Sequence, residues 1–183
     1  MRCLKTRCLE NYFLNAEVLA KVAERFCIQD ANLKNRTYIN TKLKEIATRF
    51  LNFNIQLIVK EYVKSHAEIT KPSVGAVETK TVAQIQAEYT SVLAASLQEQ
   101  ARALSTAAIS RVFSNAESKL KQALTNNDWL SDFSGKEIFS VYCGTHLRLV
   151  PEQVRQAYIE IALEKKPEIF QDVIDIFNQF KGQ

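Results

Sequence analysis

The stretch TVAQIQAEYTSVLAASLQEQARALSTAAISRVFSNAESKLKQAL, residues Thr81–Leu124, decides the fold because it is the longest uninterrupted helical pattern in the chain. It contains no glycine and no proline, and its apolar residues recur every three or four positions, as they do on one side of a helix. Thr81 and Gln84 have the form of a capping box, which predicts where the helix begins. A single helix of this length would extend about 65 Å, which is too long for one small core. We therefore expect it to pair with a second long helix or to break in two.

A second long helix is predicted over Thr37–His66. Its apolar residues are spaced alternately by four and three positions, which is the spacing of a heptad seam. A second apolar row runs beside this seam, so we expect the helix to contact two or more neighbours. The seam is our candidate interface and consists of Ile39, Leu43, Ile46, Phe50, Phe53 and Leu57.

The segment 68–80 is predicted to link the two long helices, because Pro72, a glycine and several small polar residues cannot continue a helix. The expected arrangement is an antiparallel hairpin of Thr37–His66 against Thr81–Leu124. Small residues are frequent at 94–96 and over 101–108, where they would permit either close packing or a kink. The sequence leaves both outcomes open.

Shorter helices are predicted on both sides of this hairpin. Asn15 has the position of an N-cap for a helix over Glu17–Cys27. Ser134 and Glu137 have the spacing of a capping box for a helix that stops near Gly144. Two further helices follow, with first-turn prolines at Pro151 and Pro167.

We therefore predict an all-α fold, in which a long antiparallel helical hairpin packs with several shorter helices in a single domain over residues 1–183. Its parts are a lead-in and short helix over 1–30, the hairpin over 37–125 with its linker at 68–80, and the C-terminal helices over 126–183. Trp129, in a loop, is expected to be an apolar plug over an edge of the core.

The composition indicates a folded, helical protein, since 46% of the 183 residues are hydrophobic and only 4 are glycine and 3 proline. A formal net charge of +4 permits contact with nucleic acid but does not require it. None of the 4 cysteines lies in a CxxC pair, and no apolar run approaches the length of a membrane span, about 18 residues. We expect reduced cysteines, a cytoplasmic location and no membrane partner.

No catalytic, cofactor-binding or metal-binding residues are predicted. His66 and His146 are the only histidines, and neither has ligand partners at helical spacing. Cys143 and His146 could share one helical face, but two ligands make only half a metal site. The sequence contains no nucleophile elbow, no HExxH motif and no glycine-rich phosphate loop. We therefore expect that the chain is not an enzyme and takes no cofactor.

Two short motifs carry a family resemblance. The first, LENYFL at Leu9–Leu14, is followed by EVLA at Glu17–Ala20. The second begins with DWL at Asp128–Leu130 and continues with FSGKEI at Phe133–Ile138. In this order, and with a helical insertion between them, the motifs resemble segments that follow the metal-binding part of the TOPRIM domain in ATPases of the overcoming-lysogenisation-defect type and their uncharacterised relatives.

The resemblance implies a helical region that follows a TOPRIM core. Members of the family carry an ATPase domain with Walker motifs and a TOPRIM core whose acidic residues hold Mg²⁺ for DNA cleavage, and these motifs are absent from this sequence. The chain would then be a C-terminal region, the second half of a split gene or a truncated relic. The matched residues would be structural, as a turn leaving a sheet and as a helix start, and Lys136 would also be able to reach a phosphate backbone. They are Glu10, Asn11, Tyr12, Trp129, Gly135, Lys136 and Glu137.

The leading hypothesis is a non-catalytic helical module that completes or regulates an ATPase–TOPRIM protein, acting in protein assembly and also in DNA contact. The alternative is a free-standing helical homodimer or adaptor, whose interface is the heptad seam. A further hypothesis is DNA binding through basic residues, although acidic residues interleave with them as on any solvated helix. The basic candidates are Lys34, Arg36, Lys42, Lys44 and Arg49.

Overall fold

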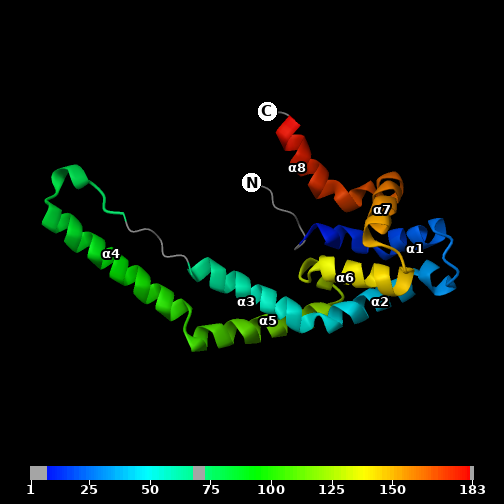
Figure 1. Ribbon diagram of the computed structural model, residues 1–183, viewed down its shortest axis with the longest axis horizontal. Helices are drawn as coiled ribbons and strands as arrows, with labels where there is room; N and C mark the ends of the chain where they lie inside the picture. Colours follow the sequence, from blue (N-terminus) through cyan, green and yellow to red (C-terminus); the bar gives the residue numbers. More distant parts are fainter. Residues whose placement is uncertain (1–7, 68–72, 182–183) are drawn as a thin grey trace. The chain divides into compact units, whose positions relative to one another are not determined.

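The structure is a computed structural model that describes residues 8–67 and 73–181 (Figure 1). Every regular element in these residues is a helix and none is a strand, which confirms the predicted all-α class. The chain divides into two compact units, the first formed by Met1–Asn54 with Lys119–Gln183 and the second by Ile55–Ser118. The expectation of a single helical domain over residues 1–183 stays a prediction.

The first unit contains most of the short helices, and several begin where the sequence predicts. The Asn15 side chain accepts hydrogen bonds from the backbone amides of Glu17 (3.0 Å) and Val18 (3.2 Å), so it is the predicted N-cap. Pro151 is the first residue of its helix, also as predicted. The elements are the 3-10 helix η1 (Leu9–Leu14), α1 (Ala16–Arg25), the 3-10 helix η2 (Ala31–Lys34), α2 (Arg36–Arg49), the start of α3 (Leu51–Ala67), the end of α5 (Thr106–Asn126), the 3-10 helix η4 (Trp129–Ser131), α6 (Gly135–Tyr142), the π-helical turn η5 (Cys143–Leu147), α7 (Pro151–Lys165), the 3-10 helix η6 (Pro167–Phe170) and α8 (Gln171–Lys181).

The core of the first unit is built around α1 and α6. Helix α1 packs against α2 and α7, while α6 packs against α2 and η1. The ring centroid of Phe13 lies 5.6 Å from that of Phe139 and 5.5 Å from that of Tyr158, which joins η1, α6 and α7 in one aromatic cluster. Trp129 is only 5% exposed and meets Phe133 edge-on at 6.2 Å, which confirms its predicted role as an apolar plug.

The long pattern over Thr81–Leu124 breaks in two, which is one of the two expected outcomes. Helix α4 spans Val82–Ala103, and the capping box predicted at its start is present. Leu104 then leaves the helical backbone (φ −95°, ψ 11°). The hydroxyl of Ser105 accepts the backbone amide of Ala108 at 3.3 Å, so α5 begins with a new N-cap inside the segment of small residues.

The second predicted long helix, Thr37–His66, is also broken, so the hairpin of two long helices is not confirmed. Helix α2 ends at Arg49 and α3 begins at Leu51, while Phe50 between them is not helical (φ −92°, ψ 12°). The Phe50 carbonyl accepts both the backbone amide (3.0 Å) and the side-chain amide (2.8 Å) of Asn54. The buried side chain of Asn54 therefore competes for the backbone carbonyl of Phe50. The heptad spacing of the apolar residues gives no sign of this competition.

The predicted linker, 68–80, belongs to the second unit and is described from Ser73 onward, since 68–72 lie outside the described residues. It contains a short 3-10 helix, η3 (Val77–Thr79). The chain enters η3 through Ala76, whose backbone is left-handed (φ 52°). The described part of this segment is thus irregular, as the sequence predicts.

Helix α6 does not begin with the capping box that was predicted at Ser134. The Ser134 side chain makes no capping hydrogen bond. Its backbone amide donates instead to Asn54 Oδ1 (2.7 Å), and the amide of Gly135 donates to Asn11 Oδ1 (3.1 Å). Two asparagines that are remote in sequence therefore satisfy the helix start, and the local prediction is wrong for that reason.

Helix α6 ends at Tyr142, close to the stop predicted near Gly144. The chain continues through Gly144 as the π-helical turn η5. The turn ends at Arg148, whose backbone is left-handed (φ 55°), and the amide of Leu149 closes it on the carbonyl of Cys143 at 3.2 Å. The left-handed residue that ends the helix is therefore an arginine and not the glycine.

Asn11 joins the beginning of the chain to the segment that precedes α6. Its buried side-chain amide donates to the carbonyls of Leu130 and Phe133 (2.8 Å for the latter), and its oxygen accepts the Gly135 amide. A Cβ on Gly135 would lie 2.5 Å from the backbone nitrogen of Asn11, so this close approach requires glycine. We call Asn11, Leu130, Phe133 and Gly135 the Asn11 clasp.

Gly135→Ala should lower the free energy of unfolding by about 2 kcal/mol or more, because the added methyl group must displace the backbone of Asn11. Gly144→Ala is the matched control, since no atom lies within 4 Å of its added Cβ. It should leave stability unchanged or raise it by up to about 1 kcal/mol, because alanine favours helix. Urea denaturation followed by far-UV circular dichroism measures both, and equal losses would contradict the account.

Candidate functional site

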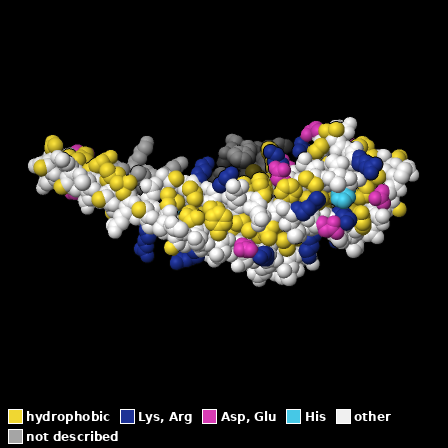
Figure 2. Space-filling view, turned by 60° about the horizontal axis from the view of Figure 1, so that its bottom comes forward, with side chains coloured by type: hydrophobic (Ala, Val, Ile, Leu, Met, Phe, Trp, Pro, Cys, Tyr) yellow, Lys and Arg dark blue, Asp and Glu magenta, His cyan; other side chains and the backbone are white. Residues whose placement is uncertain are grey.

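Helix α4 exposes an unusual amount of apolar side chain. None of its 22 residues, all of which the structure describes, is buried. Val82 is 80% exposed, and Tyr89, Val92 and Leu97 are 41–45% exposed. Figure 2 shows hydrophobic side chains at the surface in the part of the view where α4 lies. An exposed apolar row of this kind is characteristic of an interaction surface. We call Val82, Ile85, Tyr89, Val92, Leu93 and Leu97 the α4 apolar face.

Polar contacts within the second unit hold both ends of α4. Near its C-terminal end, the hydroxyl of Tyr62 donates to the carbonyl of Ala103 (3.0 Å), and the side-chain amide of Gln100 donates to the carbonyl of the last residue of α3 (2.6 Å). Near its start, Lys80 forms an ion pair with Glu88 (2.6 Å). None of these contacts uses the α4 apolar face, which remains open to a partner.

The candidate interface predicted from the heptad seam is not one continuous surface. Phe53 is 37% exposed, and its ring meets that of Phe50 at 6.1 Å, while Phe50 and Leu57 are half-buried. An interface role for these three residues stays a prediction. The other three residues are at most 1% exposed and belong to the chain's own core, so they cannot meet a partner in this fold: Ile39, Leu43 and Ile46.

The residues of the two family motifs lie close together in the first unit. Asn11 and Gly135 belong to the Asn11 clasp, and Trp129 lies beside it in η4. The Tyr12 hydroxyl donates to the carboxylate of Asp172. The expectation that Glu10, Asn11 and Tyr12 form a turn leaving a sheet is wrong for the described residues, because these three residues lie in the 3-10 helix η1. The remaining motif residues are exposed or half-exposed: Glu10, Lys136 and Glu137.

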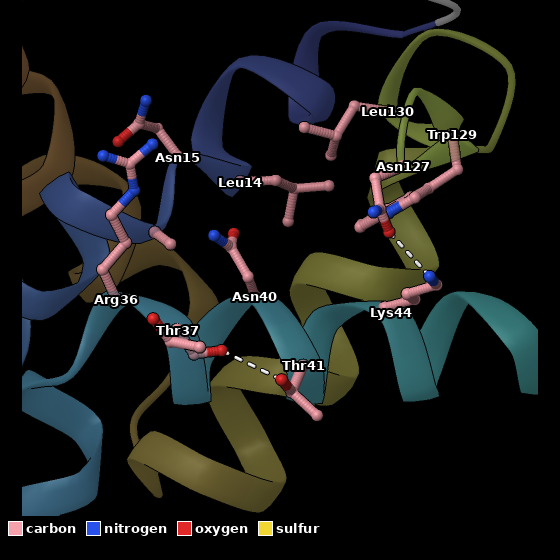
Figure 3. A pocket seen from close by; sticks show the side chains of 11 residues that line it. Leu14, Asn15, Arg36, Thr37, Asn40, Thr41, Lys44, Asn127, Trp129 and Leu130 are labelled. Carbon is pink, nitrogen blue, oxygen red and sulfur yellow. Dashed lines mark hydrogen bonds between the residues drawn. The ribbon is translucent and has the colours of Figure 1, made fainter. Parts of the chain in front are cut away.

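A cleft of about 680 Å³ opens within the first unit between three segments (Figure 3). The η1–α1 junction and the turn after α5 form two of its walls. We call it the α2 cleft, because one face of α2 supplies the third wall. This cleft was not predicted from the sequence, although the sequence shows a stripe of polar residues at helical spacing on α2. The stripe consists of Arg36, Thr37, Asn40, Thr41 and Lys44.

Two titratable side chains of the turn η5 have pKa values that their surroundings shift. Burial raises the pKa of the Cys143 thiol to about 12, so the thiol stays protonated at neutral pH and is a poor nucleophile. Desolvation, and then the nearby charge of Lys42, lowers the pKa of His146. Within the described ranges, no group of three or more His, Cys, Asp or Glu side chains is placed to hold a metal ion.

The five basic residues considered for DNA contact lie in η2 and α2. Lys42 is paired with Glu45 at 2.8 Å, which offsets its charge. Arg36 and Lys44 line the α2 cleft. The other two, Lys34 and Arg49, are exposed. In the part of the chain that the structure describes, no helix is long and apolar enough to cross a membrane.

Comparisons of the chain with protein-family models, with curated proteins and with solved structures found no match. The resemblance to the ATPase family therefore depends on the two sequence motifs. Two surfaces of the structure are candidates for a function: the α4 apolar face and the α2 cleft.

His146 should make stability depend on pH. Its pKa in the folded chain lies below the ordinary 6.5, because desolvation, Lys42 and Arg49 outweigh Glu45 and Asp30. Above pH 6.5 the residue is neutral in both states and contributes no pH dependence. As the pH falls below 6.5, the unfolded chain binds the proton first, so the free energy of unfolding decreases until the folded pKa is reached. Chemical denaturation at several pH values should show a smaller decrease for His146→Gln, and identical profiles would rule this out.

Proposed function

We propose that this chain is a non-catalytic helical module for protein assembly, and that it acts through the α4 apolar face. The observation that carries this proposal is the lack of any buried residue in α4, although the helix bears six apolar residues on one side. Helices in proteins owe most of their stability to the packing of such a face and little to helix propensity. A partner helix laid along the face would provide that packing.

The charges of α4 favour a second copy of this chain as the partner. Only Glu88, Glu99 and Arg102 are charged in the helix, and Glu88 is already paired with Lys80. Two copies of α4 would therefore meet with little electrostatic repulsion. A two-fold axis would also place the same apolar face on both sides of the contact, which is the usual symmetry of a homodimer.

The other partner to consider is a subunit with ATPase and TOPRIM domains, which the family resemblance implies. Its support is that the two motifs carrying the resemblance meet in and around the Asn11 clasp. Such a subunit would compete for the same apolar face, and adding it would dissociate the homodimer.

Contact with DNA is a further part of the proposal. It would use basic residues along η2 and α2, namely the exposed Lys34, Arg36 and Arg49 and the half-exposed Lys44. Binding through phosphates predicts an affinity that falls steeply as the salt concentration rises.

Leu97→Glu tests the assembly surface directly. Leu97 lies on the α4 apolar face and is 44% exposed, so the glutamate is solvated in the monomer but would be buried in the assembly. We expect light scattering to show a concentration-dependent dimer for the unaltered chain. The substitution should weaken the dimer by about tenfold or more, because it removes an apolar contact and desolvates a charge.

Gln98→Glu is the matched control, because it adds the same charge at the neighbouring position, on the opposite side of the helix. It should leave the mass distribution unchanged, and both variants should keep the circular dichroism of the unaltered chain. A monomer at every concentration, or equal effects of the two variants, would overturn assembly through this face.

A further inference from the structure

The α2 cleft collects positive charge without acidic residues in its lining. Arg36 and Lys44 line it from the same face of α2. They are eight residues apart, or about 12 Å along the helix axis. None of the described residues that line the cleft is an aspartate or a glutamate. The cleft therefore has the electrostatic character of an anion site.

The two cations are available to a ligand. Within the described ranges, Arg36 forms no ion pair and no side-chain hydrogen bond, while Lys44 donates to the neutral Asn127 Oδ1 at 2.6 Å. Glu17 adjoins the wall formed by the η1–α1 junction and interacts electrostatically with Arg36. Its ion pair is with Lys166 at 2.6 Å, and this contact is the main reason that the pKa of its carboxyl lies below the usual range. Arg36 is therefore not the ion-pair partner of Glu17.

Neutral polar side chains line the cleft between the two cations. Figure 3 shows Asn15 beside Arg36 at one end, Lys44 with Asn127 at the other, and Asn40 between them. Amides can donate to phosphate oxygens and also accept from sugar hydroxyls, so the lining suits a ligand that carries both. Leu14, Leu130 and Trp129 add an apolar patch for the body of such a ligand.

We propose that the α2 cleft binds a small organic bisphosphate, with one phosphate group at Arg36 and the other at Lys44. The volume of about 680 Å³ lies within the range of small-molecule sites. Only these two cations are among the lining residues, and the remaining basic residues of η2 and α2 lie outside the cleft, so the cleft itself suits a small phosphate compound. Lys44 would exchange its neutral partner, Asn127, for a charged oxygen.

Trp129 provides the signal for the test, because it is the only tryptophan of the chain and lines the cleft. Its fluorescence should be titrated with fructose 1,6-bisphosphate and with ribose 5-phosphate in the full chain, with fructose and sodium chloride at equal ionic strength as controls. Both phosphates should produce a saturable change, with the bisphosphate binding more tightly, while fructose and chloride should not.

Arg36→Gln and Lys44→Gln should each weaken the binding of fructose 1,6-bisphosphate by about tenfold or more, since each removes a charge-assisted hydrogen bond to one phosphate group. Arg49→Gln is the matched control: it removes the same charge from the same helix, outside the cleft, and should leave the affinity unchanged. An equal loss in all three variants, or no saturable change with either phosphate, would overturn the proposal. A change produced only by a single-stranded oligonucleotide would also overturn it and assign the surface to nucleic acid.

Discussion

The first unit depends on one buried amide side chain, that of Asn11, having all its hydrogen-bonding groups paired. Leaving such a group unpaired would cost about 1–3 kcal/mol. Pairing requires the carbonyls before α6 to face η1, and it requires a glycine at 135 so that the two backbones can approach. With η1 held against α6, Phe13 reaches the aromatic cluster with Phe139 and Tyr158. The Asn11 clasp thus links the start of the chain to its C-terminal helices.

The second unit follows a different principle. Helix α4 is specified by local signals, a capping box at its start and a new N-cap at Ser105 after its end, and by polar contacts at both ends. No core covers its apolar face. The first unit buries many apolar side chains in its core, whereas no residue of α4 in the second unit is buried. This asymmetry, more than any motif, supports the assembly function.

Local signals in the sequence predicted the elements that depend on neighbouring residues. The N-cap at Asn15, the capping box at Thr81 and the first-turn Pro151 all satisfy or spare backbone groups within a few residues. Predictions failed where distant side chains decide the outcome. The side chain of Asn54 bonds to the carbonyl of Phe50 where the predicted long helix breaks, although the heptad spacing of the apolar residues continues. Together with Asn11, Asn54 also replaces the local cap at Ser134. The α2 cleft was missed for the same reason, since only folding brings Asn127 to α2.

Hydrogen exchange of the α4 amides, measured at several protein concentrations, tests the assembly function most directly. Amides in the core helices α1, α6 and α7 should be protected equally at all concentrations, because their burial is internal to the chain. Those of α4 should exchange rapidly in dilute solution and become protected as the concentration rises and a second copy covers the apolar face. Protection of α4 that does not change with concentration would contradict the account.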